Sequence, residues 1–174
     1  KLNKGVVALG AARGGNYVVS IPDDITATLV NGIAIFENIS IYEGTFLTKS
    51  EFVDDSQTNQ RFILPNSNID TSSIRVNVID KGQDFTFNSY TNIFDVNASS
   101  RLFLVQEIND EKYQILFGDG ILGKKPSNGS QINISYITTS GIDGNGATNF
   151  NFSGKLTDNN CLLYTSPSPR DLLK

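Results

Sequence analysis

The fold is decided by the run I-R-V-N-V-I at residues 74–79. Apolar Ile74, Val76 and Val78 alternate there with polar Arg75 and Asn77. Successive side chains of a strand point to opposite faces, so this alternation is typical of a strand with one buried face. Runs rich in β-branched and aromatic residues recur on both sides of it, at residues 16–21, 33–41, 46–53, 61–64, 102–108, 113–117 and 132–138.

Turn signals separate these runs. They include Asn31-Gly32, Lys81-Gly82, Gly118-Asp119-Gly120 and the glycine-rich residues 141–146. Glycine and asparagine tolerate the positive φ angles that tight turns require. No segment of helical length carries an apolar stripe with a period of 3.6 residues. The sequence therefore predicts a mainly β fold of antiparallel strands and hairpins, in one domain or two small β subdomains, with little helix.

Composition argues against several classes of function. The 174 residues include no histidine and one cysteine, Cys161, which removes the usual general base and the usual metal ligands. The 14 lysine and arginine residues are scattered among 18 aspartate and glutamate residues, without a basic stripe for nucleic acid. No apolar run approaches the ~20 residues of a membrane helix. We expect no catalytic, cofactor-binding or metal-binding residues, no cofactor, and no nucleic-acid or membrane partner.

Two glycine-rich motifs have alternative interpretations. Asp119 in Gly118-Asp119-Gly120 has the chemistry to bind a metal, and the glycine amides to bind an anion, but a turn after a strand is the better interpretation. Residues 143–146 read D-G-N-G, like the start of a calcium loop, yet the later ligands of such a loop are missing. We interpret both as turns.

The last 14 residues read C-L-L-Y-T-S-P-S-P-R-D-L-L-K, residues 161–174. Back-translation of residues 161–171 gives a string that resembles a transposase sequencing adapter, so we expect this stretch to be an artefact. The natural sequence would then end near Asn160. The chain also opens on Lys1 and contains no methionine, so we expect a fragment of metagenomic origin from a longer reading frame.

One ordered series of blocks resembles a known family. It contains Y-Q-I-L-F-G-D-G-I-L-G-K-K-P at residues 113–126 and T-S-G-I-D-G-N-G-A at residues 139–147. Upstream blocks are Y-E-G-T-F at residues 42–46 and Q-R-F-I-L-P-N at residues 60–66. Together they are similar to the baseplate wedge proteins of contractile-tailed bacteriophages, the baseplate J-like family. The likeness extends from Gly14 to Ala147 and leaves residues 1–13 unplaced.

The resemblance implies a structural, non-enzymatic function. Such proteins form part of the ring around the tail hub and rearrange when the tail contracts. Their partners would be other wedge subunits, including copies of the chain itself, and their location the virion tail baseplate, assembled in the host cytoplasm. The segments expected are residues 1–13 unplaced, 14–82 as one β-rich segment, 83–160 as a second that contains the F-G-D-G hairpin, and 161–174 as artefact.

The matched residues have structural roles in this interpretation. Gly118 and Gly120 would permit a tight reversal, with Phe117 anchored in the core and Asp119 bonded to local backbone amides. Gly123 would permit a second bend, and Lys124 and Lys125 would face a neighbouring subunit. Arg61 would pair with a nearby carboxylate on the sheet surface.

Two other functions stay open at this stage. A secreted or surface-attached β-sandwich, such as an adhesin or a carbohydrate-binding module, would suit the asparagine-rich turns and the many tyrosines, although the chain has no tryptophan for a sugar platform. An enzyme fragment with its catalytic residues outside this window has no support in the residues present.

Overall fold

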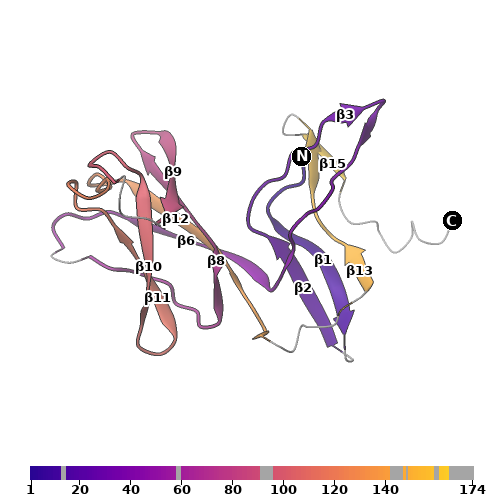
Figure 1. The fold of residues 1–174 in the computed structure, drawn as a ribbon, viewed down its shortest axis with the longest axis horizontal. Helices are drawn as coiled ribbons and strands as arrows, with labels where there is room; N and C mark the ends of the chain where they lie inside the picture. The colour runs from indigo at the N-terminus through magenta and orange to yellow at the C-terminus, as the bar shows by residue number, and fades with distance from the viewer. Residues whose placement is uncertain are drawn as a thin grey trace. The chain divides into compact units, whose positions relative to one another are not determined.

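The computed structural model describes residues 1–12, 15–57, 60–90, 96–141, 147, 149–158 and 161–164. These residues form fifteen strands and no α-helix, which confirms the predicted mainly β fold (Figure 1). The described part of the chain therefore also contains no helix with the length and apolarity to cross a membrane. The chain divides into two compact units, residues 1–46 with 139–174, and residues 47–138.

The first unit is built on an antiparallel four-stranded sheet in the order β13-β1-β2-β5. Two further strand pairs, β3–β4 and β14–β15, are separate from that sheet. The buried side chains of Leu2, Val7 and Ile21 form the core cluster of this first unit. The strands are β1 (Gly5–Ala12), β2 (Gly15–Ile21), β3 (Leu29–Val30), β4 (Ile33–Ala34), β5 (Tyr42–Glu43), β13 (Asn149–Phe152), β14 (Leu156–Asp158) and β15 (Cys161–Tyr164).

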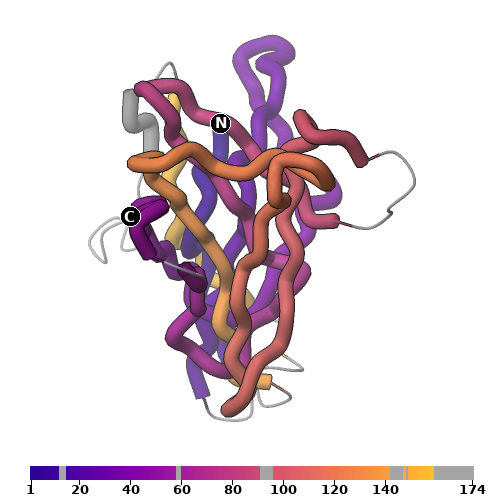
Figure 2. The backbone as a smooth tube through the Cα atoms, turned by 90° about the vertical axis from the view of Figure 1, so that its left-hand side faces the viewer, coloured from indigo at the N-terminus to yellow at the C-terminus, as the bar shows by residue number. Residues whose placement is uncertain are grey.

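The second unit is a seven-stranded sheet in the order β6-β12-β8-β9-β10-β11-β7, curled into a nearly closed barrel. Most neighbouring pairs are antiparallel, including the β10–β11 hairpin that Figure 2 shows as two long adjacent tubes, whereas β9 and β10 are parallel. The strands are β6 (Thr45–Phe52), β7 (Phe62–Ile63), β8 (Ile69–Asp80), β9 (Gln83–Ser89), β10 (Leu102–Ile108), β11 (Lys112–Phe117) and β12 (Gln131–Thr138).

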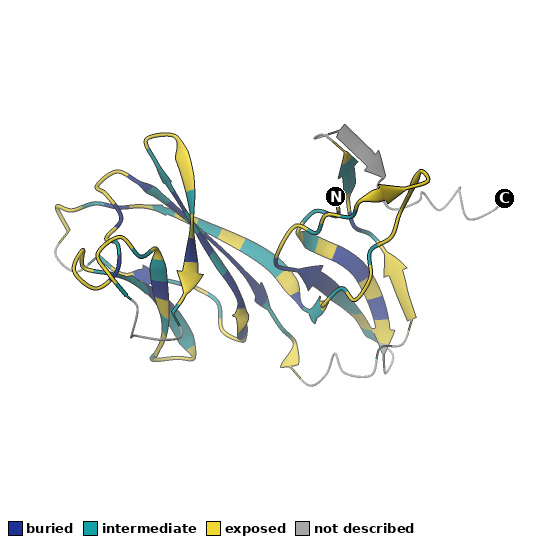
Figure 3. Ribbon diagram, turned by 45° about the horizontal axis from the view of Figure 1, so that its top comes forward, coloured by how far each residue is buried: buried dark blue, intermediate teal, exposed yellow. Residues whose placement is uncertain are grey.

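The core of the second unit follows the alternation in the sequence. Ile74, Val76 and Val78 on β8 are buried, whereas Arg75 and Asn77 between them are partly exposed. Figure 3 colours the strands by the burial of their residues. This confirms the strand predicted at residues 74–79. The neighbouring strand β12 repeats this pattern, with Ile132 and Ile134 buried. The sheet encloses one cluster of apolar side chains that come from all seven strands or from residues next to them. The cluster contains Val53, Phe62, Leu64, Ile69, Ile74, Val76, Val78, Phe87, Phe103, Ile115, Ile132, Ile134 and Tyr136.

The compact units differ from the segments expected from the sequence. The expected boundary at residue 82 falls inside the β8–β9 hairpin, where Asp80 pairs with Gln83 across Lys81-Gly82. Both turn residues have positive φ angles, 50° and 79°, as a two-residue hairpin turn requires. Five residue pairs, from Asp80–Gln83 to Val76–Phe87, hold β8 and β9 in one sheet. Residues 5–12, which the sequence left unplaced, form the strand β1.

A serine side chain completes the hydrogen bonding at an irregularity between β8 and β12. The register shifts there, so that Ser135 pairs with Arg75 but Ile137 pairs with Asp70. The buried Ser73 hydroxyl accepts the Ile137 amide at 2.9 Å and donates to the Asp70 carbonyl at 2.6 Å. The hydroxyl thus satisfies backbone groups that the interrupted ladder leaves unpaired.

The substitution Ser73→Ala is expected to lower the free energy of unfolding by about 1–3 kcal/mol, because it leaves a buried backbone N–H without a partner. Chemical denaturation measures the loss. Ser72→Ala is the matched control, since the Ser72 hydroxyl is exposed and donates to the exposed Asp70 carboxylate, and its effect should stay within about 0.5 kcal/mol. Equal effects of the two substitutions would contradict this role of Ser73.

Candidate functional site

The expected F-G-D-G hairpin is not formed. Strand β11 ends at Phe117 and lies between β10 and β7, whereas β12 lies between β6 and β8. Residues 118–130 are therefore a long connection between strands that are not neighbours. The glycines at positions 118 and 120 correctly indicate that the chain turns after β11, but they do not indicate which strand it joins next. The hairpin partner of β11 is the preceding strand β10, not β12.

Hydrogen bonds hold the first part of this connection, residues 118–123, in one conformation. The Asp119 carboxylate accepts the backbone N–H groups of Ile121 and Leu122, both at 2.8 Å. The Gly120 amide donates to the Gly123 carbonyl at 3.0 Å. Gly120 and Gly123 have φ angles of 92° and 87°, in the region that favours glycine. We call residues 118–123 the glycine loop.

Phe117 lies at the base of the glycine loop and points into the core. Its ring makes edge-to-face contacts with Phe62, at 5.5 Å between centroids, and with Phe87, at 5.4 Å. Aromatic pairs in this geometry contribute about 0.5–1.5 kcal/mol beyond the area they bury. Phe117 thus anchors the start of the glycine loop to the core, and the hydrogen bonds of Asp119 and Gly120 hold the rest of the loop.

The backbone amides of Leu122 and Ile121 lower the pKa of Asp119 below its usual 3.8. A lowered pKa in the folded state means that the carboxylate stabilises the fold above the unfolded pKa, and that this stabilisation disappears as the pH falls through the folded pKa. Asp119→Ala should lower the melting temperature at pH 7, and the difference from the wild-type chain should shrink below pH 4. Thermal unfolding measured from pH 7 to pH 2 tests this.

Asp119→Asn is the matched control, because its side-chain oxygen still accepts both amides without the charge. It should retain more stability at pH 7 than the alanine variant and show a weaker pH dependence. A wild-type-to-alanine difference that stays constant from pH 7 to pH 2 would contradict the role of the carboxylate.

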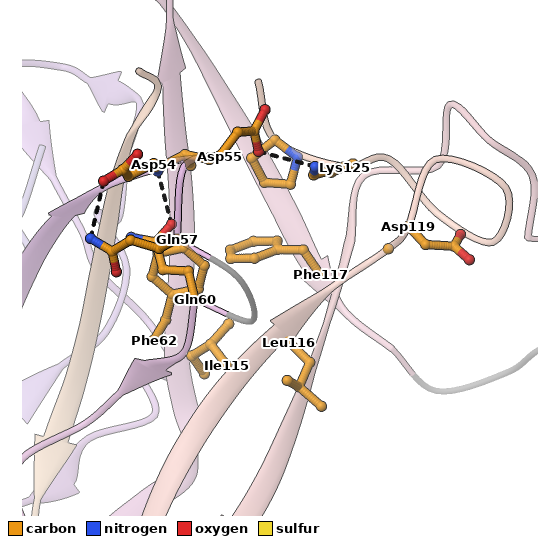
Figure 4. A pocket seen from close by; sticks show the side chains of 13 residues that line it. Asp54, Asp55, Gln57, Gln60, Phe62, Ile115, Leu116, Phe117, Asp119 and Lys125 are labelled. Carbon is orange, nitrogen blue, oxygen red and sulfur yellow. Dashed lines mark hydrogen bonds and ion pairs between the residues drawn. The ribbon is translucent and has the colours of Figure 1, made fainter. Parts of the chain in front are cut away.

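A cleft of about 390 Å³ opens beside Phe117, between the end of β11 and the segment that joins the edge strands β6 and β7. Figure 4 shows Phe117 and Ile115 on the side of Phe62, with Leu116 on the opposite side of β11. Lys49 of β6 donates to the Ile63 carbonyl of β7, so a side chain bridges the two edges. The lining combines polar and apolar residues: Val53, Asp54, Asp55, Gln57, Gln60, Phe62, Ile115, Leu116, Phe117, Gly118, Asp119, Lys125 and Pro126.

The carboxylates of this cleft are engaged locally. Asp54 accepts the amide and hydroxyl of Ser56 and the side chain of Gln57, and these hydrogen bonds lower its pKa. Asp55 forms an ion pair with Lys125 at 3.0 Å (Figure 4). Among the residues that the structure describes, no three histidine, cysteine, aspartate or glutamate side chains gather as a metal site would require. The carboxylates of Asp54 and Asp55 are thus bonded to neighbouring side chains or backbone groups.

The other sequence-predicted residues fall in different places. Lys124 lies over the ring of Phe85, 5.1 Å from its centroid, and Lys125 binds Asp55. The Arg61 side chain donates to the amide oxygen of Gln114 at 2.6 Å, where the sequence predicted a carboxylate partner. The calcium-like stretch at residues 143–146 lies outside the described residues.

Sequence reasoning missed two surface features. One is the β3–β4 hairpin, whose apolar residues are exposed although they flank an Asn-Gly turn. The other is Arg101, which also lies over Phe85, 4.2 Å from the ring centroid. The first had a signal, because both strands of the hairpin are apolar at successive positions. The second had none, since residues 85 and 101 are brought together only by the β9–β10 pairing.

Comparison with known proteins supports the resemblance in the sequence. No protein-family model matches the chain. It is 24% identical, in an alignment 164 positions long that covers 86% of the chain, to the baseplate wedge protein gp6 of Enterobacteria phage T4. The chain spans about a quarter of the length of that curated relative, 24%. The predicted resemblance to baseplate wedge proteins is thereby confirmed, and the chain is a distant homologue of one such protein.

Proposed function

We propose that this chain is a structural segment of a contractile-tail baseplate wedge. It would act through protein–protein contacts in the ring around the tail hub and in the rearrangement of that ring on contraction. The observation that carries the proposal is the homology to a wedge protein along most of the chain. Because the chain spans only part of that relative, contacts made by the whole protein are part of the proposal.

An exposed apolar hairpin supports a role in assembly. Leu29, Val30, Ile33 and Ile35 are 62–66% exposed in and beside the β3–β4 pair. Adjacent strand residues point to opposite faces, so Leu29 and Val30 make both faces of this hairpin apolar. An isolated two-stranded hairpin is at best marginally stable in water, and apolar patches of this kind mark interaction sites. A protein partner that covers both faces would stabilise the hairpin.

The chemistry of the chain agrees with a non-enzymatic role. The chain has no histidine, and the carboxylates at the described cleft bond to neighbouring amides, hydroxyls and a lysine. A structural subunit acts through surfaces of fixed shape and needs no side chains that exchange protons. The glycine loop, held by hydrogen bonds from Asp119 and Gly120, is one such surface.

The partners that we propose are other wedge subunits, including copies of the chain itself, in the tail baseplate of the virion. Nucleic acid and membranes are not among them. Of the two lysines proposed as subunit contacts, Lys124 is the better candidate, because Lys125 is already paired with Asp55. Assembly would take place in the cytoplasm of the bacterial host.

Sequencing of the source DNA across both ends of this reading frame tests the proposal. We expect genes for tail-tube, sheath and other baseplate proteins beside it, and a frame that continues past residue 160 without residues 161–174. A signal peptide upstream, with a cell-wall anchor or glycan-active domain downstream, would favour a surface binding module and overturn the proposal.

Co-expression with the neighbouring tail proteins then tests the hairpin. A variant with Leu29, Val30 and Ile33 replaced by serine should lose capture of at least one of them while it retains the wild-type melting temperature, because these side chains are exposed. A matched variant, Ile121→Ser, removes an exposed apolar side chain of the second unit and should keep that capture. Unchanged capture by the triple variant would rule out the hairpin as a contact.

A further inference from the structure

The strand β6 has one side on which no neighbouring strand is paired. The seven-stranded sheet runs from β6 to β7, so these two are its edges among the strands that the structure describes. Towards β12, the Val53 amide donates to the Ser130 carbonyl at 2.9 Å, and the Val53 carbonyl accepts the Gly129 amide at 2.8 Å. Since the backbone groups of successive strand residues point to opposite sides, the Phe52 carbonyl and the Asp54 amide face the open side.

The side chain of Gln60 bonds to both of these open backbone groups. Its amide nitrogen donates to the Phe52 carbonyl at 2.7 Å, and its amide oxygen accepts the Asp54 backbone N–H at 2.9 Å. Figure 4 shows the bond to Asp54 as a dashed line. The orientation of the Gln60 amide follows from this pattern, because the reverse orientation would place two donors against each other.

The two bonds of Gln60 are those that a residue of a parallel strand would make. In a parallel ladder, one residue donates its N–H to the carbonyl before its partner and accepts the N–H after its partner. The Gln60 amide does both, to the residues on either side of Val53. A side-chain amide offers the same kinds of donor and acceptor as the backbone. Gln60 therefore takes the place of one residue of a strand parallel to β6.

The position opposite Val53 adjoins an apolar part of the cleft beside Phe117. Val53 is buried and lines this cleft together with Phe62 and Phe117. The side chains of paired residues in neighbouring strands lie on the same face of a sheet. A residue opposite Val53 would thus direct its side chain into the cleft. The residues on either side of it would point outward, towards Phe52, which is 63% exposed.

The contacts across the open side of β6 are made by side chains that can rotate away. Lys49 donates to the Ile63 carbonyl of β7, and Gln60 bonds to the end of β6. An incoming peptide that replaced Gln60 would restore both hydrogen bonds at the edge and would add the contact of its own side chain with the cleft. The exchange therefore leaves no backbone group of the edge without a partner.

We propose that the edge of β6 at residues 52–54 binds an extended segment of another protein chain as an added parallel strand, and that Gln60 covers this edge until the segment binds. The segment would carry an apolar side chain opposite Val53. The inference rests on the proposed baseplate function for the identity of the partner, which would be another subunit of the assembly. The chemistry of recognition depends only on the geometry of the edge.

The test uses a fluorescent peptide of alternating valine and threonine with a lysine at each end. Two matched peptides carry a methyl group on one backbone nitrogen, either of the central valine or of the threonine next to it. A valine that points into the cleft directs its N–H to the Phe52 carbonyl, whereas the threonine N–H faces away from β6. Fluorescence anisotropy with the intact chain should show that methylation of the valine weakens binding about tenfold more than methylation of the threonine.

Two variants test the role of Gln60. Gln60→Ala should bind the unmethylated peptide about tenfold more tightly, because the peptide no longer displaces a side chain from the edge. Gln57→Ala is the matched control, since Gln57 lines the same cleft but its side chain bonds to the Asp54 carboxylate and not to the backbone edge. Its affinity should stay within about twofold of the wild type. Circular dichroism establishes that both variants are folded.

Equal weakening by the two methyl groups would overturn the proposed strand pairing, and this comparison needs only the wild-type chain. No binding to Gln60→Ala, or equal affinities of Gln60→Ala and Gln57→Ala, would overturn it as well. A Gln60→Ala dimer in sedimentation that excess peptide does not dissociate would assign the edge to a second copy, against the proposal. None of these results touches the proposed baseplate function, which depends on the gene neighbourhood and on the location of the chain in the virion.

Discussion

The substitution Gly118→Ala is expected to lower the free energy of unfolding by about 3 kcal/mol or more, because overpacking against a fixed backbone costs about 1–3 kcal/mol and occasionally exceeds that. A Cβ atom at Gly118 would lie 2.2 Å from the Gly123 carbonyl carbon and 2.5 Å from its Cα atom. The atoms in the way are backbone, held by hydrogen bonds within the glycine loop, and they have no rotamer to change. Thermal and chemical unfolding measure the loss.

Gly120→Ala is the matched control for this prediction. No atom lies within 4 Å of a Cβ at Gly120, but its φ of 92° is unfavourable for alanine. The expected cost is about 1–2 kcal/mol, the strain of the left-handed region alone. If Gly120→Ala destabilised the chain as much as Gly118→Ala, close approach of the two backbone segments would not be what requires glycine at position 118.

The substitution Ile134→Ala is expected to cost about 2–5 kcal/mol, the usual range for removing a large aliphatic side chain from a core. Ile134 is 0% exposed at the centre of β12 and pairs with Val76 of β8. Strands close around it from both sides, so the cavity has little freedom to collapse. The midpoint of chemical denaturation gives the change directly.

Ile121→Ala is the control for the core, since its side chain is 76% exposed on the glycine loop. Its effect on stability should stay within about 0.5 kcal/mol. A cost below 1 kcal/mol for Ile134→Ala would show that the seven-stranded sheet is not packed around this position.

The strands were predictable because they depend on local periodicity. The alternation at residues 74–79 predicts which side chains of β8 face the core, and Lys81-Gly82 predicts the turn that follows. The partners of a strand depend on residues far away in the sequence. Gly118-Asp119-Gly120 therefore marks a reversal without showing that β11 and β12 lie apart in the sheet.

The same limit applies to the site. An aspartate between glycines indicates bonds to nearby amides, and Asp119 makes two of them. Leu104 and Leu116 lie opposite each other only because β10 and β11 pair as a hairpin. The contact of Arg101 with Phe85 needs the parallel β9–β10 pairing. Tertiary pairing creates these features, so single-sequence patterns do not contain them.

The most direct test of the structural role is to locate the chain in virus particles. Antibodies raised against this chain would be applied to tailed phage particles purified from the source sample, and the labelled particles viewed by electron microscopy. The account predicts label at the baseplate end of contractile tails, together with peptides of this chain in the mass spectrum of the particles. Particles without label or peptides, with the protein found instead in the secreted or cell-surface fraction, would contradict it.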